Sequence, residues 1–333
     1  MQEFSVVSSR GGRKESEHTV SVIVVDAGGA VVAHAGDAEL ATFWRSASKP
    51  FQLYPLVADG GVERFDLDDA MLALACGSHN GESVHREIAA RWLARIGVSE
   101  ADLVCGGHPS LWPALAEAMI HDDVTATPIW SNCSGKHAAM LASARLHDWG
   151  ISGYESPDHP VQRLIAASIA RWTAIPESSL AWGLDGCNAP AVALPLAGMA
   201  RAYCALGESP DAAINRIRTA MLGQPYLVAG AERLDTVLMQ AWSERVIAKI
   251  GADGVYSAAL PGLGLGLALK VHDGDMRAAA VALVAVLEAL TGRFASAQSW
   301  PTDTLGTWRQ PVIRNTRSIE TGRIETRGGL AWA

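Results

Sequence analysis

The sequence predicts an α+β fold, in which antiparallel strands from both chain ends form a sheet that packs against helices. The first observation is 19-TVSVIVVDAGGAVVAHAG-36, where two β-branched runs flank a DAGG turn, as in a β-hairpin. The second is the return of strand patterns late in the chain, at 246–250, 255–260 and 265–272. Because the residues between these ends show mainly helical spacing, the terminal strands are expected to join one sheet.

The size and composition predict a large buried core. The chain has 333 residues, of which 49% are hydrophobic and 19% are charged. We expect a single domain over 1–333, with mixed sheet from about 1–45 and 245–333 and a mainly helical region at about 46–244.

Helix start and stop residues locate the elements of the middle region. The first helix is expected to begin near Ser46 and to end at 60-GG-61, with Pro50 in its first turn, where proline is tolerated. Ser99 and Asp102 predict a capping box for a short helix. Further helices are predicted at 67–76, 83–97, 159–174, 211–222, 231–243 and 277–291.

Two other segments of the middle region are rich in polar residues. The segment 128-PIWSNCSGKHAAMLASARLHDWG-150 leads from a loop or short strand into a helix, so Cys133 to Lys136 are expected at a helix N-terminus, which attracts anions. The segment 182-WGLDGCNAPAVALP-195 is rich in turn residues and is expected to be a loop.

Charge and hydropathy exclude several classes of partner. The formal net charge is −8 and no basic stripe is present, which argues against nucleic acid. The first twenty residues lack a basic segment followed by an apolar one, so they do not resemble a signal peptide. The most apolar run, 254–269, is interrupted by Pro261 and by glycines and is too short for a bilayer. We expect a cytoplasmic protein without a membrane partner.

Lysine is scarce in this chain, with five lysines against 22 arginines. An arginine serves where only a positive charge is needed, so a retained lysine can mark a site that needs an amine able to lose its proton. Three of the five, Lys49, Lys136 and Lys249, lie in polar segments that could carry chemistry.

The segment 44-WRSASKPFQLYP-55 contains the first of these lysines. Ser46 and Lys49 are three residues apart and share a helix face, so a neutral lysine amine could accept the proton of an attacking serine hydroxyl. Ser48 points elsewhere. The alternative is a serine N-cap ahead of a solvated lysine.

Two further segments offer hydroxyl and amine groups. The loop 76-CGSHNGE-82 presents Ser78 and His79 after an apolar helix, and such loops often bind small polar ligands, although a plain connecting loop is the alternative. Lys249 ends a predicted strand before a glycine turn. Serine hydrolases of the penicillin-recognising kind place a lysine on a strand in this way, and a solvated lysine is the alternative.

The five cysteines are odd in number and fit free thiols or metal ligands better than a disulfide framework. Cys133 and Lys136 in 132-NCSGKH-137, with Cys187 in 185-DGCN-188, could hold a tetrahedral zinc ion through two thiolates and a nitrogen. The usual CxxC spacing is absent, so two unrelated buried thiols are the alternative.

Six motifs together resemble one known family. RSASKP, CGSHNGE, CGGHPS (105–110), SNCSGKH, DGCNAP and KIGADG occur in the same order in the class 3 L-asparaginases, the rhizobial type also called the asparaginase II family, and the resemblance covers nearly the whole chain. It implies a fold like that of serine β-lactamases and glutaminases, a homodimer, and an amidohydrolase that converts L-asparagine to L-aspartate and ammonia.

Carried over position by position, the resemblance also implies three groups of site residues. The catalytic group consists of two serine–lysine pairs, Ser46 with Lys49 and Ser78 with Lys249. The metal group, holding a Zn2+ that tunes substrate binding, consists of Cys133, Lys136 and Cys187. The substrate-binding group consists of Arg45, His79 and Asp185, the last near a metal-bound water or the substrate ammonium. Ser48 stands where relatives have alanine, so it adds a second hydroxyl.

Three questions stay open at the level of sequence. Either Ser46 or Ser78 could carry the acyl group. L-Glutamine is one methylene longer than L-asparagine, a difference worth only about 1 to 3 kcal/mol in a pocket, so an L-glutaminase is an alternative. A non-catalytic amino-acid sensor on the same scaffold is a second alternative.

Overall fold

The computed structural model describes residues 2–295 and 300–333 of the chain. The chain forms two compact units. One, here called the sheet unit, consists of Met1–Ala47, Leu194–Glu208 and Val237–Ala333. The other, here called the helical unit, consists of Ser48–Ala193 and Ser209–Thr236. The expectation of a single domain over 1–333 stays a prediction.

The sheet unit is built on a nine-stranded sheet whose pairings are antiparallel. Seven strands follow the order β10-β11-β1-β2-β9-β8-β7, while β3 pairs with β2 and β12 pairs with β3. Their bounds are β1 (Phe4–Arg10), β2 (Arg13–Asp26), β3 (Val31–Ala35), β7 (Ile247–Gly251), β8 (Val255–Leu260), β9 (Leu265–Val271), β10 (Val312–Arg314), β11 (Glu320–Gly328) and β12 (Ala331–Trp332). The strands come from both chain ends, as predicted, and the α+β class is confirmed.

The predicted DAGG hairpin is present between β2 and β3. Gly29 occupies the left-handed region with φ 83°, which glycine adopts without steric cost. The Asp26 carboxylate accepts the Ala30 N–H at 2.9 Å and so closes the turn. The strand register follows from this turn and places Val24 opposite Ala33.

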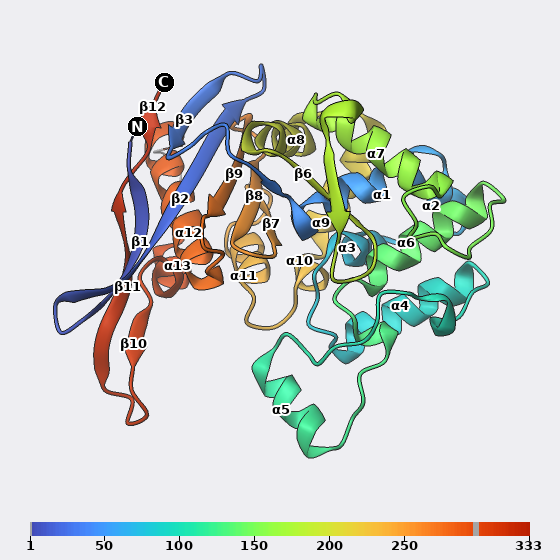
Figure 1. The fold of residues 1–333 in the computed structure, drawn as a ribbon, viewed down its shortest axis with the longest axis horizontal. Coiled ribbons are helices and arrows are strands. Elements are labelled where there is room, and N and C mark those ends of the chain that lie inside the picture. Colours follow the sequence, from blue (N-terminus) through green and yellow to red (C-terminus); the bar gives the residue numbers. More distant parts are fainter. Residues whose placement is uncertain (1, 296–299) are drawn as a thin grey trace. The chain divides into compact units, whose positions relative to one another are not determined.

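Two helices cover the two faces of this sheet, α8 (Leu196–Glu208) on one side and α12 (Met276–Phe294) on the other (Figure 1). The segment from Val20 to Val25 is therefore buried on both faces, which explains its continuous run of β-branched residues. Helix α8 lies so close to β9 that a Cβ atom at Gly266 would stand 2.2 Å from the Ala200 carbonyl oxygen.

Four further elements, one strand and three helices, have their bounds in or next to the segments of the sheet unit. They are β4 (Ala41–Phe43), the 3-10 helix η1 (Arg45–Ser48), α11 (Leu234–Ala241) and α13 (Thr302–Arg309). The strand β10, the strand β11 and the helix α13 lie in the last forty residues, where the sequence carries only a weak pattern.

The helical unit packs its helices around α6, which is buried along most of its length. Helices α1 and α3 both contact α6, and both also contact α9. The bounds are α1 (Lys49–Ala58), α2 (Gly61–Arg64), α3 (Asp69–Cys76), α4 (Ser83–Arg95), α5 (Pro113–His121), α6 (Ser134–Leu146), α7 (Pro160–Thr173), α9 (Ala212–Gly223) and α10 (Pro225–Val228). Three 3-10 helices join them, η2 (Glu100–Asp102), η3 (Pro128–Trp130) and η4 (Glu177–Ser179).

Local signals in this unit are confirmed with one exception. The capping box is formed, because the Asp102 carboxylate accepts the Ser99 N–H at 2.8 Å. The expected loop over 182–195 is wrong, since β5 (Ala181–Leu184) and β6 (Pro190–Pro195) form an antiparallel hairpin there. The turn residues are confined to 185–189, and the apolar residues after them pair as a strand.

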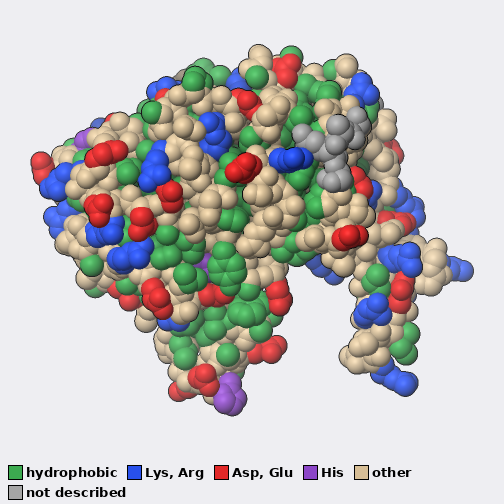
Figure 2. All heavy atoms as spheres, turned by 180° about the vertical axis from the view of Figure 1, so that it is seen from behind, with side chains coloured by type: hydrophobic (Ala, Val, Ile, Leu, Met, Phe, Trp, Pro, Cys, Tyr) green, Lys and Arg blue, Asp and Glu red, His purple; other side chains and the backbone are tan. Residues whose placement is uncertain are grey.

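The surface carries mixed charge, and acidic and basic side chains are interspersed on the face drawn in Figure 2. Over the described ranges 2–295 and 300–333, none of the helices combines the length and apolar character that a bilayer crossing requires.

Candidate active site

The loop after α3 presents Ser78 in a buried position, with 3% of the residue exposed. The Ser78 N–H donates to the Val228 carbonyl at 2.8 Å, and the Asn80 N–H donates to the Ala229 carbonyl at 2.9 Å. This loop, from Gly77 to Glu82, is thus paired with the distant segment that follows α10. Glycine is needed at position 77, because a Cβ atom there would stand 2.8 Å from the Leu227 carbonyl oxygen.

Lys49 begins α1 and reaches this loop. Its side chain is buried, and its Nζ atom lies 3.2 Å from Ser78 Oγ. The same amine donates to the carbonyls of Gly77 and, at 3.1 Å, of Asn132. A neutral amine in this position can donate its two N–H groups to the two carbonyls and direct its lone pair at the Ser78 hydroxyl. The helical unit therefore brings together Lys49 and Ser78, which the family resemblance places in two different pairs.

The other expected catalytic residues lie in the sheet unit. Ser46 is half-buried in η1. Lys249 is fully buried on β7 and donates to the Ile250 carbonyl at 2.8 Å. The expected pairs Ser46 with Lys49 and Ser78 with Lys249 stay predictions.

Arg45 has an unusual backbone immediately before Ser46. Its φ is 53°, in the left-handed region that a residue with a side chain adopts only at a cost. The conformation is supported from both sides: Arg45 forms an ion pair with Asp253 at 2.8 Å, and the preceding Trp44 donates from its indole to Ser257 Oγ at 3.0 Å. The expected role of Arg45 in substrate binding stays a prediction.

His79, the neighbour of Ser78, is fully buried with a defined tautomer. Its Nδ1 atom accepts the Gly81 N–H at 3.1 Å, so the ring proton of a neutral His79 is on Nε2, which lies 3.0 Å from Ser134 Oγ. Burial, helped by the nearby basic groups of His85 and Lys49, holds the pKa of His79 well below its usual value. Both ring nitrogens are engaged within the protein, and the expected contact of His79 with substrate stays a prediction.

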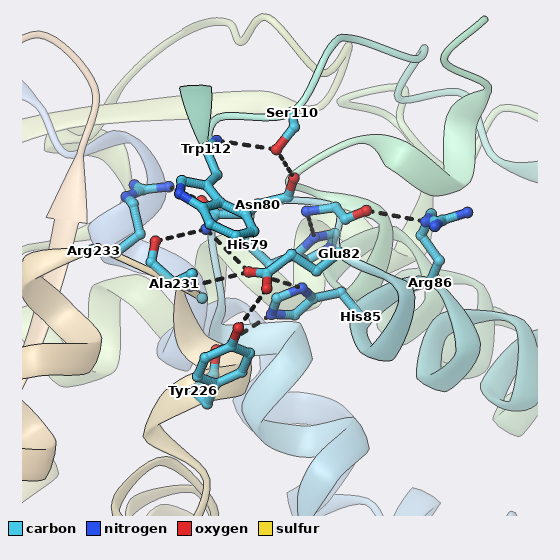
Figure 3. A network of polar contacts seen from close by, with 12 residues as sticks. His79, Asn80, Glu82, His85, Arg86, Ser110, Trp112, Tyr226, Ala231 and Arg233 are labelled. Carbon is cyan, nitrogen blue, oxygen red and sulfur yellow. Dashed lines mark hydrogen bonds and ion pairs between the residues drawn. The ribbon is translucent and has the colours of Figure 1, made fainter. Parts of the chain in front are cut away.

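A polar network holds the loop from behind (Figure 3). The Glu82 carboxylate accepts the Ala231 N–H at 3.0 Å, the Asn80 side-chain amide at 3.1 Å and the Tyr226 hydroxyl. His85 stacks between the rings of His79 and Tyr226, with its centroid 4.9 Å from the first and 5.8 Å from the second. Glu82 is thereby satisfied by neutral donors and fixes the end of the loop.

Arg233 is a residue of this site that the sequence did not indicate. Its Nη1 atom donates to the Ser78 carbonyl at 3.3 Å and to Asn80 Oδ1 at 3.0 Å. One arginine among 22 has no distinguishing sequence signal. Only the pairing of the loop with the segment after α10 reveals its position.

The motif 105-CGGHPS-110 links the two site loops. His108 Nε2 accepts the Asn132 N–H at 2.9 Å, and Ser110 Oγ donates to the Asn80 carbonyl at 2.6 Å. The Asn132 peptide therefore joins His108 on one side to Lys49 on the other. This motif acts on the site by positioning backbone, a role the sequence left unassigned.

The three expected zinc ligands lie together at the start of α6 and in the turn between β5 and β6. Cys133 and Cys187 form a hydrogen bond through their side chains, and Lys136 Nζ donates to Cys187 Sγ at 2.9 Å. All three residues are buried. Two soft sulfur atoms and one nitrogen form a donor set that suits zinc. Within residues 2–295 and 300–333, no three His, Cys, Asp or Glu side chains are grouped as metal ligands, so the set at Cys133 and Cys187 depends on Lys136 as its third member.

The side chains of Cys133, Lys136 and Cys187 strongly affect one another's pKa values. The hydrogen bond from Cys187 lowers the pKa of the Cys133 thiol well below its usual value, and that same bond raises the pKa of Cys187. Burial would lower the pKa of Lys136, but the charges of the two sulfurs and of Asp185 outweigh burial and raise it. The Cys133 thiol therefore loses its proton more readily than the Cys187 thiol.

Asp185 is half-buried in the β5–β6 turn, where its carboxylate accepts the Gly186 N–H at 2.8 Å. Because its charge raises the pKa of Lys136, Asp185 lies close to the sulfur cluster. Its expected role near a metal-bound water or the substrate ammonium stays a prediction.

Comparison with known proteins gives a family and two distant structures. A family profile described as L-asparaginase II matches residues 6–326. No curated protein matches the chain. Of the solved structures, Mglu in its native form at 4.3M NaCl is 15% identical with a TM-score of 0.38, and the match covers 83% of this chain and 61% of that one. A Bacteroides dorei DSM 17855 protein, provisionally named a beta-lactamase, is 13% identical with a TM-score of 0.37, over 81% of this chain and 84% of that one.

Proposed function

This chain belongs to the L-asparaginase II family of amidohydrolases, and we propose that it hydrolyses L-asparagine to L-aspartate and ammonia through an acyl-enzyme. The observation that carries this proposal is the 3.2 Å contact between Lys49 Nζ and Ser78 Oγ in a buried loop. A serine hydroxyl beside a lysine amine is an activated nucleophile of the kind amide hydrolysis requires.

The proposed reaction begins with attack by Ser78. The Oγ atom forms a bond to the side-chain amide carbon of asparagine while its proton passes to the neutral Lys49 amine. The C–N bond then breaks, and the resulting Lys49 ammonium returns the proton to the leaving nitrogen, which departs as ammonia. Water hydrolyses the ester to release aspartate. The carbonyls of Gly77 and Asn132 keep the Lys49 amine at this position throughout.

Other residues are proposed from the family resemblance. Ser46, which the resemblance pairs with Lys49, and Lys249, which it pairs with Ser78, would supply a second hydroxyl and a second amine for proton transfer. Arg45 and His79 would help to bind substrate. Asp185 would take the substrate ammonium. When bound by Cys133, Lys136 and Cys187, zinc would orient the polar head group of the amino acid. We also propose a cytoplasmic homodimer.

Ammonia release tests the proposed substrate. The wild-type enzyme is expected to hydrolyse L-asparagine with a higher kcat/KM than L-glutamine. A preference for glutamine would replace the proposal with a glutaminase, and binding of asparagine without ammonia release would replace it with an amino-acid sensor.

Trapping the acyl group tests the proposed nucleophile. Rapid acid quenching during turnover, followed by peptide mass spectrometry, is expected to find the added aspartyl group on the peptide that contains Ser78. A group on Ser46 would reverse the two serines. A burst of product with no label on either peptide would contradict the covalent route.

A further inference from the structure

We propose that Arg233 binds the α-carboxylate of the substrate, so that the site selects amides of free α-amino acids. The proposal rests on the proposed function, since it names the part of asparagine that this guanidinium would recognise. Nothing in the six motifs includes Arg233, and its position beside Ser78 follows only from the fold.

The first argument is the placement of the guanidinium. Its Nη1 atom donates to the Ser78 carbonyl at 3.3 Å and to Asn80 Oδ1 at 3.0 Å, which fixes one prong of the planar fork on the backbone of the Ser78 loop. Arg233 and Asn80 are both labelled in Figure 3. The α-carboxylate of asparagine is separated from the reacting amide by a short carbon chain. A cation bound to the backbone carbonyl of the attacking serine therefore lies in the region where this carboxylate would sit.

The second argument is that the charge of Arg233 is not neutralised within the protein. Across the described residues, no aspartate or glutamate forms an ion pair with its guanidinium. The nearby acid, Glu82, is separated from it by Asn80, whose amide donates to Glu82 while its oxygen accepts from Arg233. Since Arg233 is half-buried, an unpaired charge there is costly unless a ligand supplies the anion.

The third argument is that the charge acts on its surroundings. After burial, which is the largest effect, the positive charge of Arg233 contributes to the lowered pKa of both His79 and His85. The guanidinium is therefore near enough to both buried rings to disfavour their protonation. A guanidinium in such surroundings binds a carboxylate through two parallel, charge-assisted hydrogen bonds.

The experiment compares L-asparagine with 3-aminopropanamide, which is asparagine without its α-carboxylate. Arg233→Gln is expected to lower kcat/KM for asparagine by about 100-fold and to leave the slow hydrolysis of 3-aminopropanamide nearly unchanged. Arg233→Lys keeps the charge but loses the fork, so it is expected to fall between the wild type and Arg233→Gln.

Arg86→Gln is the matched control, because Arg86 holds the same loop without facing the nucleophile. Its Nε atom donates to the Gly81 carbonyl at 3.0 Å, and its guanidinium stacks on Trp130 at 3.8 Å. Arg86→Gln is expected to change kcat/KM for both substrates by the same factor. If Arg233→Gln also lowers kcat/KM for both substrates by the same factor, Arg233 only anchors the loop and the proposal is overturned.

A binding measurement separates this proposal from the proposed reaction. Calorimetry is expected to show that L-aspartate binds the wild type and binds Arg233→Gln at least about 10-fold more weakly, whereas β-alanine binds both alike. If the wild type does not hydrolyse asparagine but shows this binding pattern, the proposed reaction is rejected and the proposed carboxylate site at Arg233 is retained. Equal aspartate binding by both proteins, or none by the wild type, would overturn the site.

Discussion

The Nζ atom of Lys49 lies 3.2 Å from the Oγ atom of Ser78, and the carbonyl oxygens of Gly77 and Asn132 accept the other hydrogen bonds of the same amine. One residue at the start of α1 thus contacts two separate loops. The contact joins the Lys49 amine to the Ser78 hydroxyl, and both residues are buried, with 1% of Lys49 and 3% of Ser78 exposed.

Removal of either partner is expected to abolish turnover by different routes. Ser78→Ala removes the nucleophile, and kcat for asparagine should fall by at least about 1000-fold with a well-folded protein. In Lys49→Met, kcat should fall by a similar factor. This variant should also be less stable, since the carbonyls of Gly77 and Asn132 lose their donor. Circular dichroism and ammonia release measure the two effects. Ser48→Ala is the control, and full loss of activity in that variant would shift the assignment toward the helix start.

Acid is expected to destabilise the fold through buried histidines. His79 and His85 have lowered pKa values because of burial, so both stay neutral in the folded chain while the unfolded chain protonates them below about pH 6.5. The unfolded state then binds more protons, and the free energy of unfolding should decrease as the pH falls, by at most about 1.4 kcal/mol per pH unit for each ring.

Urea unfolding at about pH 7.5, 6.5 and 5.5 measures this slope. His85→Phe keeps an aromatic ring between His79 and Tyr226 but cannot titrate, so its slope should be smaller than that of the wild type. His121→Phe is the matched control, since 88% of the His121 side chain is exposed. Equal slopes for all three proteins would show that the buried rings do not set the pH dependence.

Gly230 is expected to tolerate no side chain. It has φ 112°, and a Cβ atom there would stand 2.3 Å from Glu82 Oε1 and 2.6 Å from Asn80 Nδ2. Gly230→Ala should therefore lower the free energy of unfolding by about 2 kcal/mol or more and reduce activity, because it pushes apart the groups that fix the Ser78 loop. Gly223→Ala, which meets no atom within 4 Å, is the control and should leave activity unchanged.

Zinc binding is expected to depend on the sulfur cluster. Elemental analysis of the purified protein should find about one zinc per chain, and Cys133→Ser or Cys187→Ser should lose it. Cys204→Ser is the control, because Cys204 lies on α8 and donates to the Gly264 carbonyl at 3.3 Å. If the wild-type protein contains no zinc, or if both cysteine variants retain zinc, the proposal of a zinc site at Cys133 and Cys187 is rejected.

Local residues predicted much of the fold. Asp26 to Gly29 specified the β2–β3 hairpin, Pro50 marked the first turn of α1, and Ser99 with Asp102 specified a capped turn, because each signal acts within a few residues. The β5–β6 hairpin was missed because the turn residues around Asp185 obscure two short strands. Strand pairing there depends on contacts that no local pattern describes.

The site was predictable only where its residues form short motifs. Ser78, Lys49 and Cys133 each stand in a recognisable segment, yet the contact between Lys49 and Ser78 joins two such segments and follows from the packing of α1 and α3 on α6. Arg233 lies outside every motif. Its contact with Ser78, across 155 residues of sequence, results from the backbone pairing of Ser78 with Val228 and of Asn80 with Ala229.

The same backbone pairing sets a time order for synthesis. The Ser78 N–H is held by the Val228 carbonyl, so a nascent chain that has left the ribosome only as far as α9 can form α1 and α3 but cannot fix the nucleophile. Contacts between residues so far apart in sequence form late in folding, because the entropy lost in ordering the intervening chain precedes the stabilisation that the contacts give. A polypeptide that ends before Val228 would thus contain Lys49 and Ser78 without the backbone contact that holds the Ser78 loop.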